Sequence, residues 1–167
     1  MNTMIKSKCF QVLSEPVSFF VSGNPVPQPR PRFTIRNGIS FAYTPKSSPI
    51  NAWKQTILIQ ARQQSKIDCG SLFCELLFVL KRPKYHFKKN ILIANSPFEH
   101  STKPDIDNLV KAVLDALMTS NTITDDSKIC SLKADKIFEN DVIKQGVFIR
   151  LKKFEPIDLL VKNNLNN

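Results

Sequence analysis

Alternating apolar and polar positions predict strands and a hairpin in the first third of the chain. Residues 17–21 (VSFFV) are typical of a strand. The stretch 24–32 (NPVPQPRPR) follows, and because its prolines remove backbone donors we expect an extended loop there. Asn37-Gly38 tolerates positive φ at both turn positions, which predicts a hairpin. The two strands of this hairpin are 33–36 and 39–43.

Apolar residues at helical spacing predict two helices. Ser48 and Pro49 offer an N-cap and a first helical residue, so we expect the first helix to run from Pro49 to about Ser65. The second helix follows Pro104 and ends near Ser120, and its apolar stripe is the most regular in the chain. The stripe of the first helix comprises Ile50, Trp53, Ile57 and Ala61, and that of the second comprises Ile106, Leu109, Val110, Val113, Leu114, Leu117 and Met118.

The remaining apolar segments predict the rest of a sheet. Residues 72–80 form an apolar run that predicts a buried strand. Segments 128–138 and 142–151 alternate around a polar turn and predict a closing antiparallel hairpin. The basic stretch 81–103 is expected to be a long surface loop. This order of elements indicates an α+β domain, a mixed β-sheet with two main helices packed on it.

The length of 167 residues fits one domain. We expect an N-terminal extension at 1–16, a single domain at 17–154 and a polar, Asn-rich tail at 155–167. No apolar stretch approaches the ~20 residues that cross a bilayer, and residues 9–13 are too short and too interrupted for a secretory signal. These features predict a cytoplasmic protein without a membrane partner.

The cysteines do not suggest a metal site. None of the four belongs to a Cys-x-x-Cys pair, and both histidines, His86 and His100, lie far from tight cysteine spacing. We therefore expect reduced, mostly buried thiols rather than a zinc site. The cysteines are Cys9, Cys69, Cys74 and Cys130.

Charge gives the first indication of function. The chain carries 24 Lys and Arg against 14 Asp and Glu, a net charge of +10 that favours a polyanionic partner such as nucleic acid. The acids are unevenly placed, because residues 1–67 contain only Glu15 whereas five of the 14 acids lie within 105–126. The stretch 81–103 has six basic residues and one acid, which suits either a solvated face or phosphate contacts.

The acidic window can bring carboxylates together. Asp105 lies just before the second helix, and Asp107 and Lys111 share one side of it, one turn apart. A short turn after the helix leads to Asp125-Asp126, which a return toward the sheet could place near them. Converging carboxylates stay ionised together around a cation, and hard oxygen ligands suit Mg²⁺ or Mn²⁺. The pattern therefore favours metal-dependent phosphodiester hydrolysis, with Lys111 stabilising phosphoryl charge.

Each of these residues also has a purely structural interpretation. Asp105 or Asp107 could cap the helix, and Asp107 with Lys111 could form a surface ion pair. Asp125-Asp126 could be turn residues. Asp115 is expected to be structural in either case.

A family resemblance is carried by the same window. The motif KPDIDNLVKAVLDAL (103–117), followed by TDDSKI (124–129) and Lys136, resembles the signature of RusA-type Holliday junction resolvases, small nucleases found in phages and prophages. The upstream RPRFT (30–34) and Tyr43-Thr44-Pro45 also resemble many members. The similarity spans about 17–151, most of the chain.

The resemblance implies a RusA-like, homodimeric fold. It implies an endonuclease dependent on Mg²⁺, or Mn²⁺ as a substitute, that nicks two opposed strands of four-way DNA junctions in DNA recombination and repair. No nucleotide cofactor is expected. The implied metal cluster is Asp105, Asp107 and Asp126, with Lys111 as the essential lysine, Asp125 as an additional ligand and Lys136 as a base or phosphate contact.

One departure and two alternatives accompany the resemblance. Members commonly carry Gln where this chain has Lys128, which puts the fine placement of substrate in doubt. A catalytically silent protein that binds branched DNA, and a nuclease that acts on flaps or forks, are the alternative functions. The expected DNA contacts are Arg30, Arg32, Arg36, Lys84, Lys88, Lys89, Lys103 and Lys136.

Overall fold

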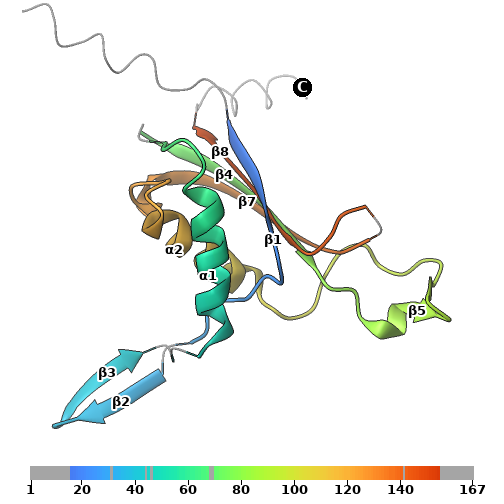
Figure 1. The fold of residues 1–167 in the computed structure, drawn as a ribbon, viewed down its shortest axis with the longest axis horizontal. Helices are drawn as coiled ribbons and strands as arrows, with labels where there is room; N and C mark the ends of the chain where they lie inside the picture. The colour runs from blue at the N-terminus through green and yellow to red at the C-terminus, as the bar shows by residue number, and fades with distance from the viewer. Residues whose placement is uncertain are drawn as a thin grey trace, which may run out of the picture.

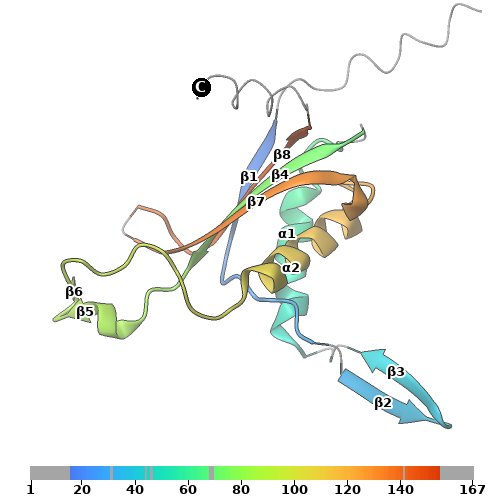
Figure 2. The same cartoon turned by 180° about the vertical axis from the view of Figure 1, so that it is seen from behind.

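The computed structural model describes residues 16–154 except 31, 44, 46, 68, 69 and 141. It contains a four-stranded mixed sheet with both helices on one face (Figures 1 and 2). The predicted α+β fold with two helices on a mixed sheet is confirmed. The strands of this sheet are β1 (Val17–Ser22), β4 (Leu72–Leu80), β7 (Ile129–Phe138) and β8 (Gly146–Lys153), in the order β1-β8-β4-β7.

The strand order corrects one prediction. The segments that form β7 and β8 do not pair as a hairpin, because β4 lies between them, antiparallel to β8 and parallel to β7. Eight of the nine residues of β4 are apolar, which is typical of a strand in the interior of a sheet. The backbone N–H of Glu139 donates to the carbonyl of Leu80 at 2.8 Å, where the chain leaves β7 and passes the end of β4.

The helices use the predicted apolar stripes. Helix α1 (Pro49–Ala61) buries Ile50, Trp53, Ile57 and Ala61 but ends four residues before the expected Ser65, because residues 62–65 are polar and have no apolar stripe to bury. Helix α2 (Ile106–Thr119) begins and ends as predicted and buries Leu109, Val113 and Leu117 against the sheet and α1. Neither helix has the length and apolar character that crossing a membrane requires, nor does any other helix within the part of the chain that the structure describes.

An ion pair joins the two helices. Lys54 of α1 donates to the Asp115 carboxylate of α2 at 2.7 Å. The two side chains are three-quarters and seven-tenths covered, so the pair fixes the register of one helix against the other. The prediction that Asp115 is structural is thereby confirmed.

The hairpin expected at Asn37-Gly38 is present. Its strands are β2 (Arg32–Arg36) and β3 (Ile39–Tyr43), and Asn37 and Gly38 have φ of 52° and 77°, as a tight turn with two left-handed residues requires. Residues 24–30 before it form neither helix nor strand, as predicted. The hairpin projects from the body of the described chain (Figure 1).

The stretch 81–103 is more ordered than a simple surface loop. It contains a 3₁₀ turn, η1 (Lys84–His86), and a two-stranded ribbon of β5 (Phe87–Lys88) and β6 (Ile91–Leu92). Both ends are anchored on β7: Arg82 is buried with its guanidinium 5.1 Å from the Phe138 ring, and the His100 N–H donates to the Lys136 carbonyl at 3.0 Å. The expectation of a surface loop is wrong at these anchors, because Arg82 and both histidines are buried there.

The two described cysteines differ in environment. Cys74 is buried in β4, and burial raises the pKa of its thiol to about 12, so it is a core residue. Cys130 is exposed, unlike the mostly buried thiols that the sequence predicts. Cys9 and Cys69 lie outside the described residues.

Candidate active site

The start of α2 is held by contacts from two other segments. The ammonium group of Lys136, on β7, donates to the carbonyl oxygens of Thr102 and Pro104 at 2.7 and 2.6 Å. From the loop before β2, the backbone N–H of Gln28 donates to the carbonyl of Asn108 at 2.8 Å. These bonds fix the turn that delivers the first residues of α2.

A hollow lies between α2, the turn after it and β7. Asp107 and Lys111 reach it from α2, and Asp126 reaches it from the 3₁₀ turn η2 (Asp126–Lys128). Its volume is about 510 Å³, and all three polar side chains are exposed. The apolar residues around them are Ile106, Val110, Leu114, Leu132 and Ala134.

Local chain geometry explains why these three residues meet. Asp107 and Lys111 are one turn apart on α2, so they share a face. Asn121, with φ of 63°, then reverses the chain, and Ile123 forms a parallel bridge to Ile67. The return places η2 at the start of β7, next to the exposed side of α2. The sequence-based expectation of a return toward the sheet is confirmed for Asp126.

Asp105 occupies a neighbouring position. It is the N-cap residue of α2, with extended backbone (φ −69°, ψ 139°), and it is exposed. It does not line the hollow with Asp107 and Asp126. Within residues 16–154, apart from the six that are not described, no three His, Cys, Asp or Glu side chains are grouped closely enough to hold one metal ion. The structure thus brings two of the three expected carboxylates together and leaves the third at the edge.

The contacts of Asp105, Asp107 and Lys111 show whether capping or ion pairing explains these residues. Among the described residues, Asp105 makes no side-chain capping hydrogen bond, and Asp107 accepts only a 3.3 Å bond from the Asn108 amide. Asp107 and Lys111, both among the described residues, form no ion pair with each other. Capping and ion pairing therefore do not account for either residue.

Asp125 does have a structural contact. Its carboxylate accepts the Ser127 N–H at 2.8 Å and caps η2. Hydrogen bonding from the Ser127 side chain, together with this backbone bond, lowers the pKa of the carboxyl group below its ordinary value. Asp125 is thus a turn residue that shapes η2, and Asp126 is the member of the pair that faces the hollow.

The donor set suits a hard divalent cation. Mg²⁺ prefers carboxylate oxygens, keeps several of its waters and commonly binds through only one or two carboxylates together with substrate phosphates. Asp107 and Asp126 supply two such groups in one hollow, and Asp105 is the residue before the helix that carries Asp107. The residues present therefore fit Mg²⁺ or Mn²⁺ better than a softer metal.

The expected DNA contacts are spread over the molecule. The loop with β5 and the β2–β3 hairpin project at opposite ends, with α2 between them in both views (Figures 1 and 2). Lys136 is instead engaged with backbone carbonyls. The side chains of Arg32 and Arg36 lie outside the described part of the structure. The exposed members of the expected set are Arg30, Lys84, Lys88, Lys89 and Lys103.

Sequence reasoning missed the β7 side of the site. Leu132 and Ala134 form the floor of the hollow, which explains why Leu132 is 46% exposed although it lies in a sheet. The alternation of β7 contains the signal, because Leu132, Ala134 and Lys136 are two residues apart and share the face toward α2. The alternation of residues in β7 does not predict the hydrogen bonds that Lys136 makes.

Comparison with known proteins places the chain in a class of DNA-cleaving enzymes. A sequence model of the family described as "Endodeoxyribonuclease RusA" matches residues 22–152. The chain belongs to the RusA endodeoxyribonuclease family, which confirms the resemblance to RusA-type Holliday junction resolvases. It is also 33% identical over 130 residues to "Uncharacterized protein YqaN" of Bacillus subtilis (strain 168), a match that covers 75% of this chain and 89% of the relative.

Proposed function

We propose that this protein is a metal-dependent endonuclease that resolves four-way (Holliday) DNA junctions by paired nicks, in DNA recombination and repair. Membership of the RusA family supports endonuclease activity, and the hollow shared by Asp107, Lys111 and Asp126 is the observation that carries the proposal for this chain. The proposal includes Mg²⁺, with Mn²⁺ as a substitute, and a phage or prophage origin.

The residues of the hollow have separate tasks in this proposal. Asp107 and Asp126, with Asp105 beside them, would hold the ion, which when bound supplies charge neutralisation at the phosphodiester and a more acidic water. Lys111 is fixed one helical turn from Asp107, so its ammonium can stabilise negative charge on the phosphoryl oxygens. Because all three side chains are exposed in an open hollow, a DNA backbone can reach them.

Paired nicking requires two sites. A homodimer with two-fold symmetry presents identical sites to a junction whose arms are themselves related by near symmetry. The net charge of +10 supplies a nonspecific attraction to the phosphates, with an affinity that depends strongly on salt. We therefore include a homodimer in the proposed function.

The experiment compares cleavage of a labelled synthetic four-way junction with cleavage of linear duplex and of a flap. Each substrate is tested with Mg²⁺, with EDTA and with the Asp107→Asn variant. Glu99→Gln is the matched control, because Glu99 is also exposed but lies outside the hollow. The proposal predicts paired, symmetric junction nicks that need the metal, vanish with Asp107→Asn and persist with Glu99→Gln.

Two other outcomes would replace the proposal. Tight junction binding without metal-dependent nicking would identify a catalytically silent protein that binds branched DNA. Faster cleavage of the flap than of the junction would identify a nuclease for flaps or forks.

A further inference from the structure

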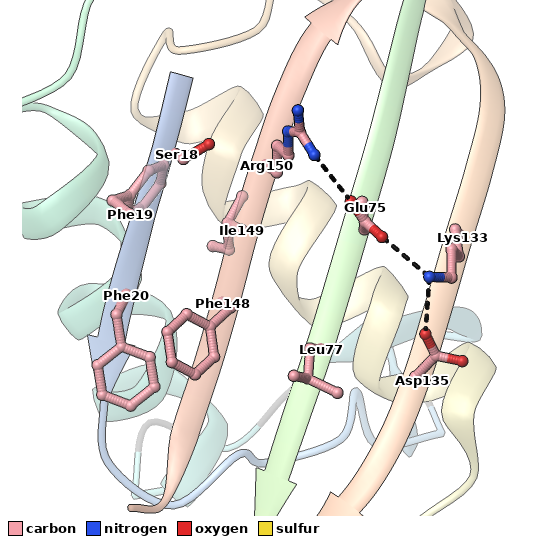
Figure 3. Close-up of a pocket in the computed structure, with 10 residues that line it drawn as sticks. All are labelled: Ser18, Phe19, Phe20, Glu75, Leu77, Lys133, Asp135, Phe148, Ile149 and Arg150. Carbon is pink, nitrogen blue, oxygen red and sulfur yellow. Dashed lines mark hydrogen bonds and ion pairs between the residues drawn. The ribbon is translucent and has the colours of Figure 1, made fainter. Parts of the chain in front are cut away.

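The sheet face opposite the helices carries an ordered pattern of side chains (Figure 3). The strand register places Ser18, Arg150, Glu75 and Lys133 in one row across β1, β8, β4 and β7. The adjacent row, two residues along each strand, contains Phe20, Phe148, Leu77 and Asp135. These two rows, called here the open face, line a hollow of about 490 Å³.

The charged residues of the open face alternate in sign across the strands. Arg150 lies 3.6 Å from one Glu75 oxygen, and Lys133 donates to the other at 3.0 Å (Figure 3). Lys133 also lies 3.5 Å from Asp135. The hydrogen bond from Lys133 lowers the pKa of Glu75, so its carboxylate stays charged at neutral pH.

The apolar residues of the open face are incompletely covered. The rings of Phe20 and Phe148 pack with their centroids 4.4 Å apart, and Leu77 lies beside Phe148 on β4. Phe148 is 42% exposed. Both helices lie on the other face of the sheet, and no element of the described chain packs over these side chains (Figures 1 and 2). Such apolar surface rimmed by charges is typical of an interface.

We propose that the open face binds the open face of a second copy of this chain, as two sheets packed face to face. A two-fold axis along the boundary between β8 and β4 would place Arg150 of each copy opposite Glu75 of the other. The same axis would place Phe148 opposite Leu77. The two central strands of the open face, β8 and β4, are therefore complementary to those of the second copy in both charge and apolar character.

The charge balance distinguishes this occupant from DNA. Arg150 and Lys133 are matched by Glu75 and Asp135, so the open face has no excess positive charge to release counterions from a phosphate backbone. The active-site hollow lies on the helix side of the sheet, so this association leaves it uncovered.

The test uses sedimentation velocity of the full-length chain without DNA. The wild type is expected to be a dimer at tens of micromolar. Arg150→Glu places like charges opposite each other, and so does Glu75→Lys, so each variant alone is expected to be a monomer. An equimolar mixture of the two variants regains opposite charges at both positions and is expected to form a heterodimer. Arg62→Glu, at the exposed end of α1, is the matched control and is expected to remain a dimer.

The mixture separates loss of association from loss of folding, because only folded chains can reassociate. If either variant loses its far-UV circular dichroism, Phe148→Ser replaces it, since a side chain that is 42% exposed can be shortened without emptying the core. A monomeric wild type, variants that remain dimeric, or folded variants that fail to reassociate would each overturn the proposal.

This inference rests on the homodimer of the proposed function, but the two fail separately. A monomer that still makes metal-dependent junction nicks would overturn the interface and leave the activity. A dimer with the predicted charge dependence that makes no nicks would overturn the activity and leave the interface.

Discussion

The ammonium group of Lys136 donates a hydrogen bond of 2.6 Å to the carbonyl oxygen of Pro104, the residue before the N-cap of α2. A second bond of 2.7 Å reaches the carbonyl of Thr102. Lys136 therefore ties the C-terminal part of β7 to the turn that delivers Asp105 and Asp107. These two bonds give Lys136 a structural role at the start of α2, beside the site.

Lys136→Met is expected to slow nicking without weakening junction binding. The substitution removes both bonds to the turn, and displacement of reacting groups by about 1 Å can cost on the order of 10²-fold in rate. Single-turnover cleavage and binding in EDTA measure the two effects separately. Lys103→Met is the contrast, because Lys103 is exposed and expected to contact phosphate, so it should lower affinity instead. A matching loss of affinity with Lys136→Met would return Lys136 to the DNA contacts.

The neighbouring Asp125 and Asp126 are expected to differ strongly in their effect on activity. Asp126→Asn removes a carboxylate from the hollow and should reduce the nicking rate by about 10²–10³-fold. Asp125→Asn keeps an oxygen that can accept the Ser127 N–H, so η2 should persist and the rate should fall by less than about tenfold. Equal losses in single-turnover assays would show that Asp125 also acts at the metal.

Local signals in the sequence predicted the local parts of the fold. Asn37-Gly38 fixed the hairpin because its left-handed turn needs no partner from elsewhere in the chain. The α2 stripe was predictable for the same reason, since helical spacing alone shows which face is buried. These features also placed Asp107 and Lys111 on one side of one helix.

The pairing of strands that are far apart in the sequence was harder to predict. The prediction joined β7 to β8 because they are close in sequence, whereas the sheet places β4 between them. The apolar character of β4, broken only by Glu75, was a usable signal of a central strand, but nothing local selects which strands flank it. The anchoring of Arg82 and Lys136 was equally hidden, because both long side chains donate to carbonyls distant in sequence.

Neutralising Lys84, Lys88 and Lys89 to Gln is expected to weaken junction binding and flatten its salt dependence. Each phosphate contact contributes roughly 0.9 to the slope of log affinity against log salt, so up to about 2.7 would be lost if all three contact DNA. Fluorescence anisotropy in EDTA across a salt series measures the slope. Neutralising Arg62, Lys66 and Lys153 gives the same net charge at other exposed positions. Equal slopes for the two triple variants would show that the loop is only a solvated face.

Acidification is expected to loosen the anchor at His100. Burial, together with the nearby Lys136, lowers the pKa of His100, and its Nδ1 is buried without a hydrogen-bond partner. Above about pH 6.5 the His100 ring is neutral whether the anchor is intact (closed) or broken (open), so the stability of the anchor does not change in that range. As the pH falls below that value, the ring is protonated first in the open state. The free energy that favours the closed state then falls by up to about 1.4 kcal/mol per pH unit, until the pH reaches the pKa of the ring in the closed state.

Hydrogen exchange at the Phe138 and His100 amides, corrected for the intrinsic pH dependence, measures this opening. Both N–H groups bond across the anchor, to the carbonyls of Phe98 and Lys136. His100→Gln is expected to remove the excess acid sensitivity. Protection that is as constant between pH 7 and pH 5 in the wild type as in the variant would contradict the prediction.

Gly146→Ala is expected to disrupt the pairing of β1 with β8. A Cβ at this position would meet the backbone carbonyl of Val21 and the ring of Phe20, and the carbonyl belongs to the paired strand and cannot rotate away. Overpacking of this kind costs about 1–3 kcal/mol, which thermal unfolding would register as a lower Tm. Gly38→Ala is the control, because its Cβ meets nothing within 4 Å and its strain stays in the projecting hairpin. A Tm for Gly146→Ala no lower than that for Gly38→Ala would show that β1 can shift to accept the methyl group.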